Sequence, residues 1–167
     1  SFKSVGNFYN QGSLLSTNSL SGGALDFSCK SFVNNHVISD FDVFSLLSDV
    51  VINRGTINVR KGEISGNSFD NSGELIGFDG LSFQVNSLGN GVSGKIVFNN
   101  DLKVCALRND MKVSIKNLGM IGDGNCDKSS SRGLELSDSD FVNEGVVTFQ
   151  GEARLRNSRL VNSGQGL

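Results

Sequence analysis

One pattern of apolar and polar residues recurs along the whole chain. Asn stands two residues after an apolar residue, Gly stands two residues after the Asn, and an aliphatic residue stands two residues after the Gly. The stretch FDNSGEL at 69–75 is an example. The asparagines of the successive copies are Asn10, Asn34, Asn53, Asn71, Asn90, Asn117, Asn143 and Asn162. Their spacings are 24, 19, 18, 19, 27, 26 and 19 residues, so the base period is about 19 residues. Repetition at this period predicts a solenoid, in which each repeat is one structural unit.

The residues around each asparagine predict short strands with a corner between them. The position two residues before each asparagine is always apolar: Phe8, Phe32, Val51, Phe69, Leu88, Ile115, Phe141 and Leu160. The aliphatic residues after the corner are Leu14, Ile38, Ile57, Leu75, Ile96, Ile121 and Val147. Two copies differ, because His36 replaces Gly in one and Gly94 follows Asn90 after two extra residues in another. Elsewhere apolar and polar residues alternate, as at 81–85 and 153–156, which is the pattern of half-buried strands.

Such a repeat, with two or three short strands, buries its apolar face only when copies stack on one another. Successive coils then pair their backbones at a spacing of about 4.8 Å, so seven to eight coils form a rod roughly 35 Å long. We expect the asparagines to stack as a ladder at one corner and the glycine to supply a positive φ there. His36 fits this expectation, since histidine is enriched among the non-glycine residues of the left-handed region.

Composition and charge narrow the fold and the function further. Gly (21), Asn (19) and Ser (25) make up 65 of the 167 residues, whereas Ala occurs three times and Glu five times. The scarcity of helix formers excludes an α-helical protein and predicts an all-β chain with many turns. A net charge of -2 argues against binding to nucleic acid by phosphate neutralisation. No apolar run reaches the roughly 18 residues that a membrane-spanning helix needs.

The FDNSGEL stretch and its copies, at a period near 19, resemble the repeats of the right-handed β-helix in filamentous haemagglutinin-type exoproteins. This family includes the contact-dependent growth-inhibition effectors that are exported by two-partner secretion. The resemblance extends from Phe8 to Gly166 and implies a right-handed parallel β-helix. The chain contains no proline and therefore none of the Asn-Pro secretion motifs of the family's amino-terminal domain. The resemblance thus implies a segment of the repetitive shaft, rather than the secretion domain or a toxin tip.

The two longest spacings predict insertions on the rod, near 96–113 and 122–133. The first contains two apolar runs broken by turn residues, which we interpret as projecting hairpins. The second is rich in Gly, Asn, Asp and Ser and predicts a surface loop. Insertions on one face of a solenoid often form its binding face. The candidate binding residues are therefore Asn99, Asn100, Asp101, Arg108, Asn109, Asp110, Lys128 and Arg132.

The three cysteines have different expected environments. Leu25, Phe27 and Cys29 alternate inward, so Cys29 is predicted to be a buried free thiol. Cys105 is expected to point outward, and Cys126 lies in the loop that follows one coil later. In an exported protein the preferred interpretation is a Cys105–Cys126 disulfide that fixes this loop, and the alternative is three unpaired thiols.

Metal and nucleophile motifs are incomplete. Asp123, Asn125 and Asp127 occupy positions 1, 3 and 5 of an EF-hand-like calcium loop. Lys128 at position 6 and Leu134 at position 12 break that pattern, so a solvated loop is expected. The lone His36 stands at a corner and has no triad or zinc spacing around it, which favours a structural role.

A β-helical polysaccharide lyase or hydrolase is the main enzymatic alternative, since such an enzyme uses carboxylates lined up outside one sheet. The outward position after each corner carries only one acidic residue, Glu74. Asp40, Asp42 and Asp49 crowd another part of the third coil, where we interpret them as solubilising charges. The arginines near the carboxyl end fit either an anionic-glycan patch or an ordinary charged strand face: Arg132, Arg154, Arg156 and Arg159.

We therefore expect residues 1–167 to form a single β-helix segment of a longer, exported bacterial surface protein, with no enzymatic activity, metal or cofactor. It would serve as an adhesin or effector shaft, secreted or held at the bacterial cell surface. The expected partners are a cell-surface receptor protein or glycan, and an outer-membrane transporter during export; nucleic acid and a membrane span are not expected. The alternative is a β-helical polysaccharide-degrading enzyme or a glycan-binding fragment.

Overall fold

The computed structural model describes residues 2–3, 6–17, 23–107, 111–123, 133–149 and 151–163, and every regular element among them is a β-strand. The strands are β1 (Phe2–Lys3), β2 (Asn7–Asn10), β3 (Leu14–Leu15), β4 (Ala24–Asn34), β5 (Val37–Asn53), β6 (Thr56–Asn71), β7 (Glu74–Asn90), β8 (Lys95–Phe98), β9 (Asp101–Cys105), β10 (Val113–Asn117), β11 (Met120–Asp123), β12 (Gly133–Ser137), β13 (Ser139–Asn143), β14 (Val146–Thr148), β15 (Ala153–Arg156) and β16 (Arg159–Asn162). A search of this described part for a helix able to cross a membrane finds none.

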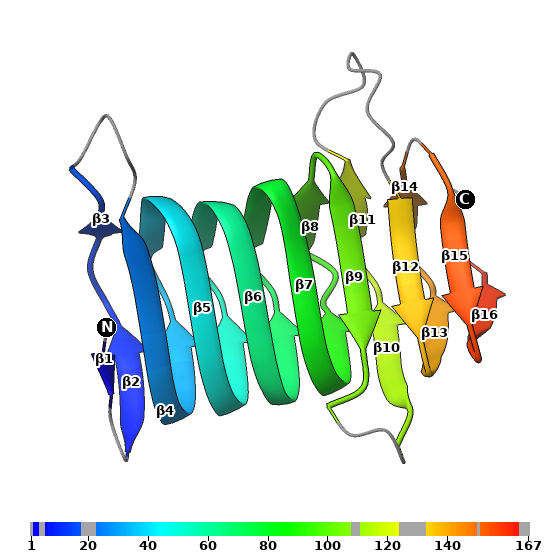
Figure 1. The fold of residues 1–167 in the computed structure, drawn as a ribbon, viewed down its shortest axis with the longest axis horizontal. Coiled ribbons are helices and arrows are strands. Elements are labelled where there is room, and N and C mark those ends of the chain that lie inside the picture. The colour runs from blue at the N-terminus through cyan, green and yellow to red at the C-terminus, as the bar shows by residue number, and fades with distance from the viewer. Residues whose placement is uncertain are drawn as a thin grey trace.

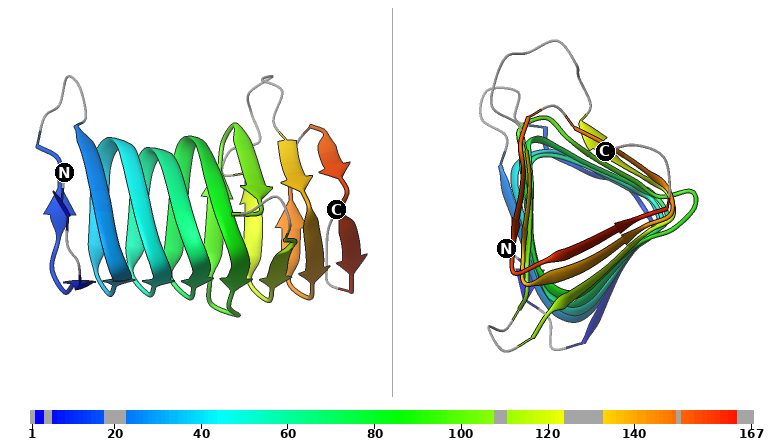
Figure 2. Two further views of the ribbon diagram at one scale, coloured as in Figure 1. Left: turned by 60° about the horizontal axis from the view of Figure 1, so that its bottom comes forward. Right: turned by 90° about the vertical axis from the view of Figure 1, so that its right-hand side faces the viewer.

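The chain forms a parallel β-helix, as predicted. Its coils stack side by side from β2 and β4 at one end to β15 and β16 at the other (Figure 1), and every strand pair is parallel. Seen along the stack, the coils superpose on a triangular outline (Figure 2). The long strands β5, β6 and β7 bend around two corners, so each of them contributes to all three sides of the triangle.

The three sides are parallel sheets that we number by their order after each asparagine. Sheet 1 consists of the strands that end at the asparagines: β2, β10, β13, β16 and the last parts of β4 to β7. Sheet 2 consists of the strands that begin after the asparagine corner: β3, β8, β11, β14 and the first parts of β5 to β7. Sheet 3 consists of β1, β9, β12, β15, the first part of β4 and the middle parts of β5 to β7.

The core consists of rows of apolar side chains that stand in register on successive strands, one or two rows per sheet. We call each row a ladder, and the residues in these ladders confirm the predicted register. On sheet 1 the in-register side chains are Phe8, Phe32, Val51, Phe69, Leu88, Ile115, Phe141 and Leu160. On sheet 2 they are Leu14, Ile38, Ile57, Leu75, Ile96, Ile121 and Val147. On sheet 3 they include Phe27, Leu46, Ile64, Phe83, Val104 and Leu136, all buried. Each such side chain contributes about 1.5–3 kcal/mol when fully buried.

The asparagine ladder runs through the described part of the chain and confirms the predicted stacking. The side-chain Nδ2 of each asparagine donates to the Oδ1 of the next, from Asn10 to Asn162, over seven hydrogen bonds of 2.7–2.8 Å. The same amide nitrogens donate to backbone carbonyls at the corner, as Asn71 does to Gly73 and Lys95 at 3.1 Å. The ladder asparagines from Asn10 to Asn143 are buried. Because their amides are hydrogen-bonded to one another, the desolvation cost of burying them is offset.

The predicted reason for the corner glycine is wrong. Among the described glycines only Gly80 and Gly151 have a positive φ. A Cβ on Gly55 would lie 2.0 Å from the backbone oxygen of His36, and one on Gly73 would lie 2.1 Å from that of Gly55. Glycine is therefore required at this corner because the preceding coil approaches too closely for a side chain.

His36 is tolerated at a glycine position for a related reason, and not because of a left-handed conformation, since its φ is not positive. Gly55 donates its backbone N–H to Asn34 of the preceding coil at 3.1 Å. The N–H of His36 instead bonds to the side chain of Asn34 in its own coil, at 3.4 Å. The first corner is thus less tightly stacked, and the ring of His36 has room beside Ser13, whose Oγ lies 3.4 Å from Nδ1.

The hairpins predicted within 96–113 are also wrong in part. Residues 95–98 and 101–105 form β8 and β9, which pair in parallel with β7 and with the following coil. Ile96 and Leu102 are buried in the core ladders, which a projecting hairpin would not allow. The extra length of this repeat lies instead in the turn before Gly94 and in residues 106–112, between β9 and β10. The predicted loop at 122–133 falls mostly outside the described residues.

Candidate binding face on sheet 3

The outer surface of sheet 3 carries an unbroken row of polar side chains. One outward ladder crosses seven successive strands with a polar side chain in each: Asp26, Ser45, Glu63, Ser82, Lys103, Glu135 and Arg154. The corresponding ladder on sheet 2 mixes apolar and polar residues, from Val37 and Thr56 to Met120 and Val146. Sheet 3 therefore offers a row of hydrogen-bonding groups repeated at the spacing of the coils, about 4.8 Å.

A second outward ladder on sheet 3 alternates charged residues with glycines. Lys61 pairs in register with Gly80, and Asp101 pairs with Gly133. A Cβ on Gly80 would lie 3.0 Å from the backbone oxygen of Asp101, and one on Gly133 would lie 2.5 Å from that of Glu152. Since the glycines have no side chains, the surface is hollowed at each of them.

The first hollow lies over Gly80, with a volume of about 260 Å³, and the second lies beside Gly133, with about 270 Å³. The first is walled by Lys61, Glu63, Asp79 and Ser82, and the second by Glu135, Glu152 and Arg154. Asp101 and Lys103 line both. The two glycines lie two strands apart, so the hollows are separated by about 10 Å.

A third hollow of about 370 Å³ extends the row toward the amino terminus. It shares Glu63 and Ser82 with the hollow over Gly80 and adds Asp26, Ser65 and Leu47, among other residues. Leu47 is 56% exposed. The three hollows form one shallow groove along sheet 3, which we call the sheet 3 groove.

Ion pairs balance most of the charge in the sheet 3 groove. Lys61 lies 2.7 Å from Glu63, and this hydrogen bond and the nearby negative charge raise the pKa of the lysine above its usual value. Lys103 lies 3.7 Å from Glu135, and Arg154 lies 3.0 Å from Glu152. The two lysine pairs are about half exposed and the Arg154–Glu152 pair about three-quarters exposed, so these pairs contribute little to stability.

An exposed aromatic residue lies in a bulge at the corner between sheets 2 and 3. The pairing of β6 with β7 shifts here, from Val59 opposite Gly77 to Lys61 opposite Gly80, so β7 contains one extra residue. Phe78 lies in this bulge and is 49% exposed. The adjacent Asp79, which lines the hollow over Gly80, accepts a hydrogen bond from Arg60. Bulges of this kind often redirect side chains near functional sites.

The structure brings only part of the sequence-predicted binding set to this face. Asn99, Asn100 and Asp101 lie where the chain turns from β8 into β9, at the same corner. Asn100 donates to the backbone oxygen of Asp79 at 3.3 Å, and Asp101 separates the two hollows. The other predicted residues lie outside the described ranges: Arg108, Asn109, Asp110, Lys128 and Arg132.

Sequence reasoning missed Lys61, Lys103, Glu135 and Glu152 as residues of one site. The available signal was the pair of glycines in register around Asp101. That register becomes visible only once the strands of sheet 3 are aligned, because sheet 3 has no asparagine marker of its own.

The described cysteines are free thiols. Cys29 is partly buried against the core, and burial raises its pKa above the usual value. Cys105 donates to the backbone oxygen of Phe83 at 3.5 Å, and burial together with the charges of Glu135 and Asp138 raises its pKa. Cys126 lies outside the described residues, and the thiol of Cys105 is free in the structure, so the predicted Cys105–Cys126 disulfide is not formed there. The calcium-like motif also falls largely outside them, and no group of three or more metal-binding side chains occurs in the part that is described.

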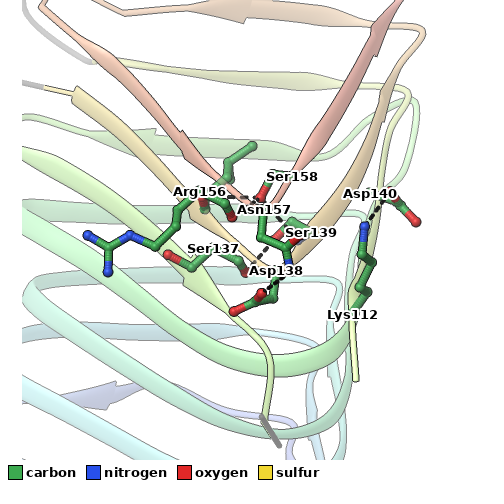
Figure 3. A network of polar contacts seen from close by, with 9 residues as sticks. Lys112, Ser137, Asp138, Ser139, Asp140, Arg156, Asn157 and Ser158 are labelled. Atoms are coloured by element: carbon green, nitrogen blue, oxygen red, sulfur yellow. Dashed lines mark hydrogen bonds and ion pairs between the residues drawn. The ribbon is translucent and has the colours of Figure 1, made fainter. Parts of the chain in front are cut away.

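A polar network closes the corner between sheets 3 and 1 at the carboxyl end (Figure 3). Asn157 donates to Asp138 at 2.6 Å, and both residues have φ 50°. Ser158 donates from its Oγ to the backbone oxygen of Arg156 at 2.8 Å. Asp and Asn adopt the left-handed conformation more readily than other non-glycine residues, so this pair forms a second, short corner ladder with a structural role.

Among the described carboxyl-terminal arginines, one has an ion-pair partner and another faces an acidic residue on the neighbouring strand. Arg154 is paired with Glu152, and Arg159 stands in register with Asp140. Three carboxylates, from Asp101, Glu135 and Glu152, line the hollow beside Gly133. Comparison of the chain with protein-family models, with curated proteins and with solved structures found no match. A function must therefore be argued from the rod and its groove.

Proposed function

We propose that this chain is a non-enzymatic shaft segment of a larger exported bacterial surface protein. A shaft must hold two points at a fixed separation, which requires stiffness along its axis. The observation that carries the proposal is the asparagine ladder, seven consecutive hydrogen bonds of 2.7–2.8 Å parallel to the rod axis inside an apolar core.

The repeat also suits export in an unfolded state. Each coil contacts mainly its neighbours, so a solenoid can fold coil by coil as the chain emerges from a transporter. The resemblance of the repeats to filamentous haemagglutinin-type exoproteins supports the same role. In this proposal the chain acts at the bacterial cell surface or after secretion, and it positions or contributes to the recognition of a cell-surface receptor protein or glycan.

Force spectroscopy on the purified chain tests the shaft role. Pulled from its two ends, a stack with nearest-neighbour contacts releases one coil at a time, and each coil of about 19 residues adds about 60 Å of extended chain. A series of such steps supports the proposal. Extension at negligible force, without steps, contradicts it.

A β-helical polysaccharide-degrading enzyme is the second candidate. The observation that favours it is the set of three carboxylates in one hollow, Asp101, Glu135 and Glu152, since glycoside hydrolysis uses two carboxyl groups across the scissile bond. Two of these three are ion-paired, which favours a non-catalytic role. Incubation with polysaccharides followed by a reducing-end assay decides between the two, and depolymerisation that is lost in Glu135→Gln would establish the enzyme.

A further inference from the structure

We propose that the sheet 3 groove binds an extended, uncharged glycan that lies along the axis of the rod. This inference goes beyond the shaft role, which requires no ligand, so either proposal can fail without the other. It depends on two observations: the shape of the groove and the balance of its charges.

The shape fits a chain rather than a compact molecule. The hollows over Gly80 and beside Gly133 are of similar size and share Asp101 and Lys103 as their common wall. Their separation of about 10 Å, two coils, follows from the stacking of the strands. A linear ligand with repeating units can place equivalent groups in both hollows, whereas a single small molecule fills only one.

The charges favour a neutral, polyhydroxylated ligand. Each hollow has both lysine or arginine donors and carboxylate acceptors on its walls, and the apolar residues that line them, Leu81 and Leu134, are buried. A polyanion would meet the carboxylates of Asp101, Glu135 and Glu152, and a polycation would meet the lysines and Arg154. Hydroxyl groups donate to the first set and accept from the second, so an uncharged glycan satisfies both.

The groove is less suited to a peptide. An extended peptide gains most of its affinity by pairing its backbone with a sheet edge, whereas the groove is the outer face of a sheet and presents side chains. Phe78, which precedes Asp79 in the adjacent bulge and is 49% exposed, does not line the hollow over Gly80.

Isothermal titration calorimetry with cellohexaose, maltohexaose and chitohexaose tests the proposal. We expect at least one of these neutral hexasaccharides to bind with a Kd of about 1 mM or tighter, and its disaccharide to bind about tenfold more weakly. The variant carrying both Asp101→Asn and Lys103→Gln alters the wall common to both hollows without changing the net charge. We expect it to lose about tenfold or more in affinity.

Lys112→Gln provides the matched control, because Lys112 pairs with Asp140 outside the groove. It should leave hexasaccharide affinity within about twofold of the unaltered chain. Circular dichroism should show that both variants fold, since the altered side chains lie at the surface. The proposal is overturned if no hexasaccharide binds, if the double variant binds as well as the control, or if polygalacturonate or a Lys-Glu repeat peptide binds more tightly than every neutral hexasaccharide.

Discussion

Replacing Asn71 by Ala removes a middle rung of the asparagine ladder. Its Nδ2 donates to Asn90 at 2.8 Å and to the backbone oxygens of Gly73 and Lys95 at 3.1 Å. Its Oδ1 accepts from Asn53 at 2.8 Å. The side chain is 1% exposed, so water does not replace these contacts.

The expected cost can be worked from these contacts. The two bonds within the ladder contribute about 1 kcal/mol each, and Asn90 is left with a buried oxygen that has lost its donor, at about 1–3 kcal/mol. Asn53 keeps a second acceptor, the backbone oxygen of Glu74 at 3.1 Å, which limits the loss on that side. The free energy of unfolding should therefore fall by about 3–5 kcal/mol.

Urea unfolding followed by circular dichroism measures this effect. With a slope of about 2 kcal/mol per molar, the midpoint should fall by about 2 M. Ser87→Ala is the matched control, because Ser87 is exposed on the neighbouring strand β7, and it should change stability by no more than about 0.5 kcal/mol.

Asn162, the last described residue of the asparagine ladder, provides the comparison that tests whether burial makes the ladder stabilising. Asn162 accepts from Asn143 at 2.7 Å, but its side chain is exposed. Water can replace the lost bond there, so Asn162→Ala should cost less than about 1 kcal/mol. If Asn71→Ala proves no more destabilising than Asn162→Ala, the buried ladder does not stabilise the rod as described.

Two further predictions concern the corners and the thiols. Gly55→Ala should destabilise the chain by about 3 kcal/mol or more, because its Cβ would lie 2.0 Å from the backbone oxygen of His36. Gly12→Ala is the control and should be near neutral, since a Cβ on Gly12 would have nothing within 4 Å. Similar melting temperatures for the two variants would contradict the close approach at Gly55. In a variant whose other two cysteines are Ser, Cys105 should react with iodoacetamide at pH 8 more slowly than in the urea-unfolded chain, because burial and then the charge of Glu135 raise its pKa and reduce the thiolate fraction. Glu135→Gln should recover part of that rate, and equal rates in folded and unfolded chains would refute the raised pKa.

The sequence is sufficient to predict sheets 1 and 2, because each of their strands is marked by the asparagine corner. The strands of sheet 3 are harder to predict from the sequence, because no asparagine corner marks them. The turn at Asn99 and Asn100 interrupts two apolar runs as a hairpin turn would, but it is a corner of the coil. The chain also changes register at this side of the triangle, between Ser39 and Phe41 and again between Val59 and Lys61. A period counted between asparagines does not locate such shifts.

The corner glycines also show that a sequence pattern within one repeat does not reveal the contacts between coils. Their presence at the asparagine corner is visible in the sequence, but the reason is contact between coils, which no single repeat contains. The sheet 3 groove has a similar origin, because Gly80 and Gly133 matter through their position beside Asp101 on neighbouring strands. Local pattern therefore predicted the coils, and the contacts between coils determined the candidate site.

The stacking of coils in register is the central claim, and a distance between two spin labels tests it most directly. Ser31 and Asp140 are joined by five in-register steps on sheet 1, through Val50, Ser68, Ser87 and Ser114. In a background without native cysteines, labels at these two positions should give one narrow distribution that corresponds to a backbone separation of about 24 Å. A flexible chain of the same 109-residue separation would give a broad distribution around about 60 Å, and that result would contradict the β-helix.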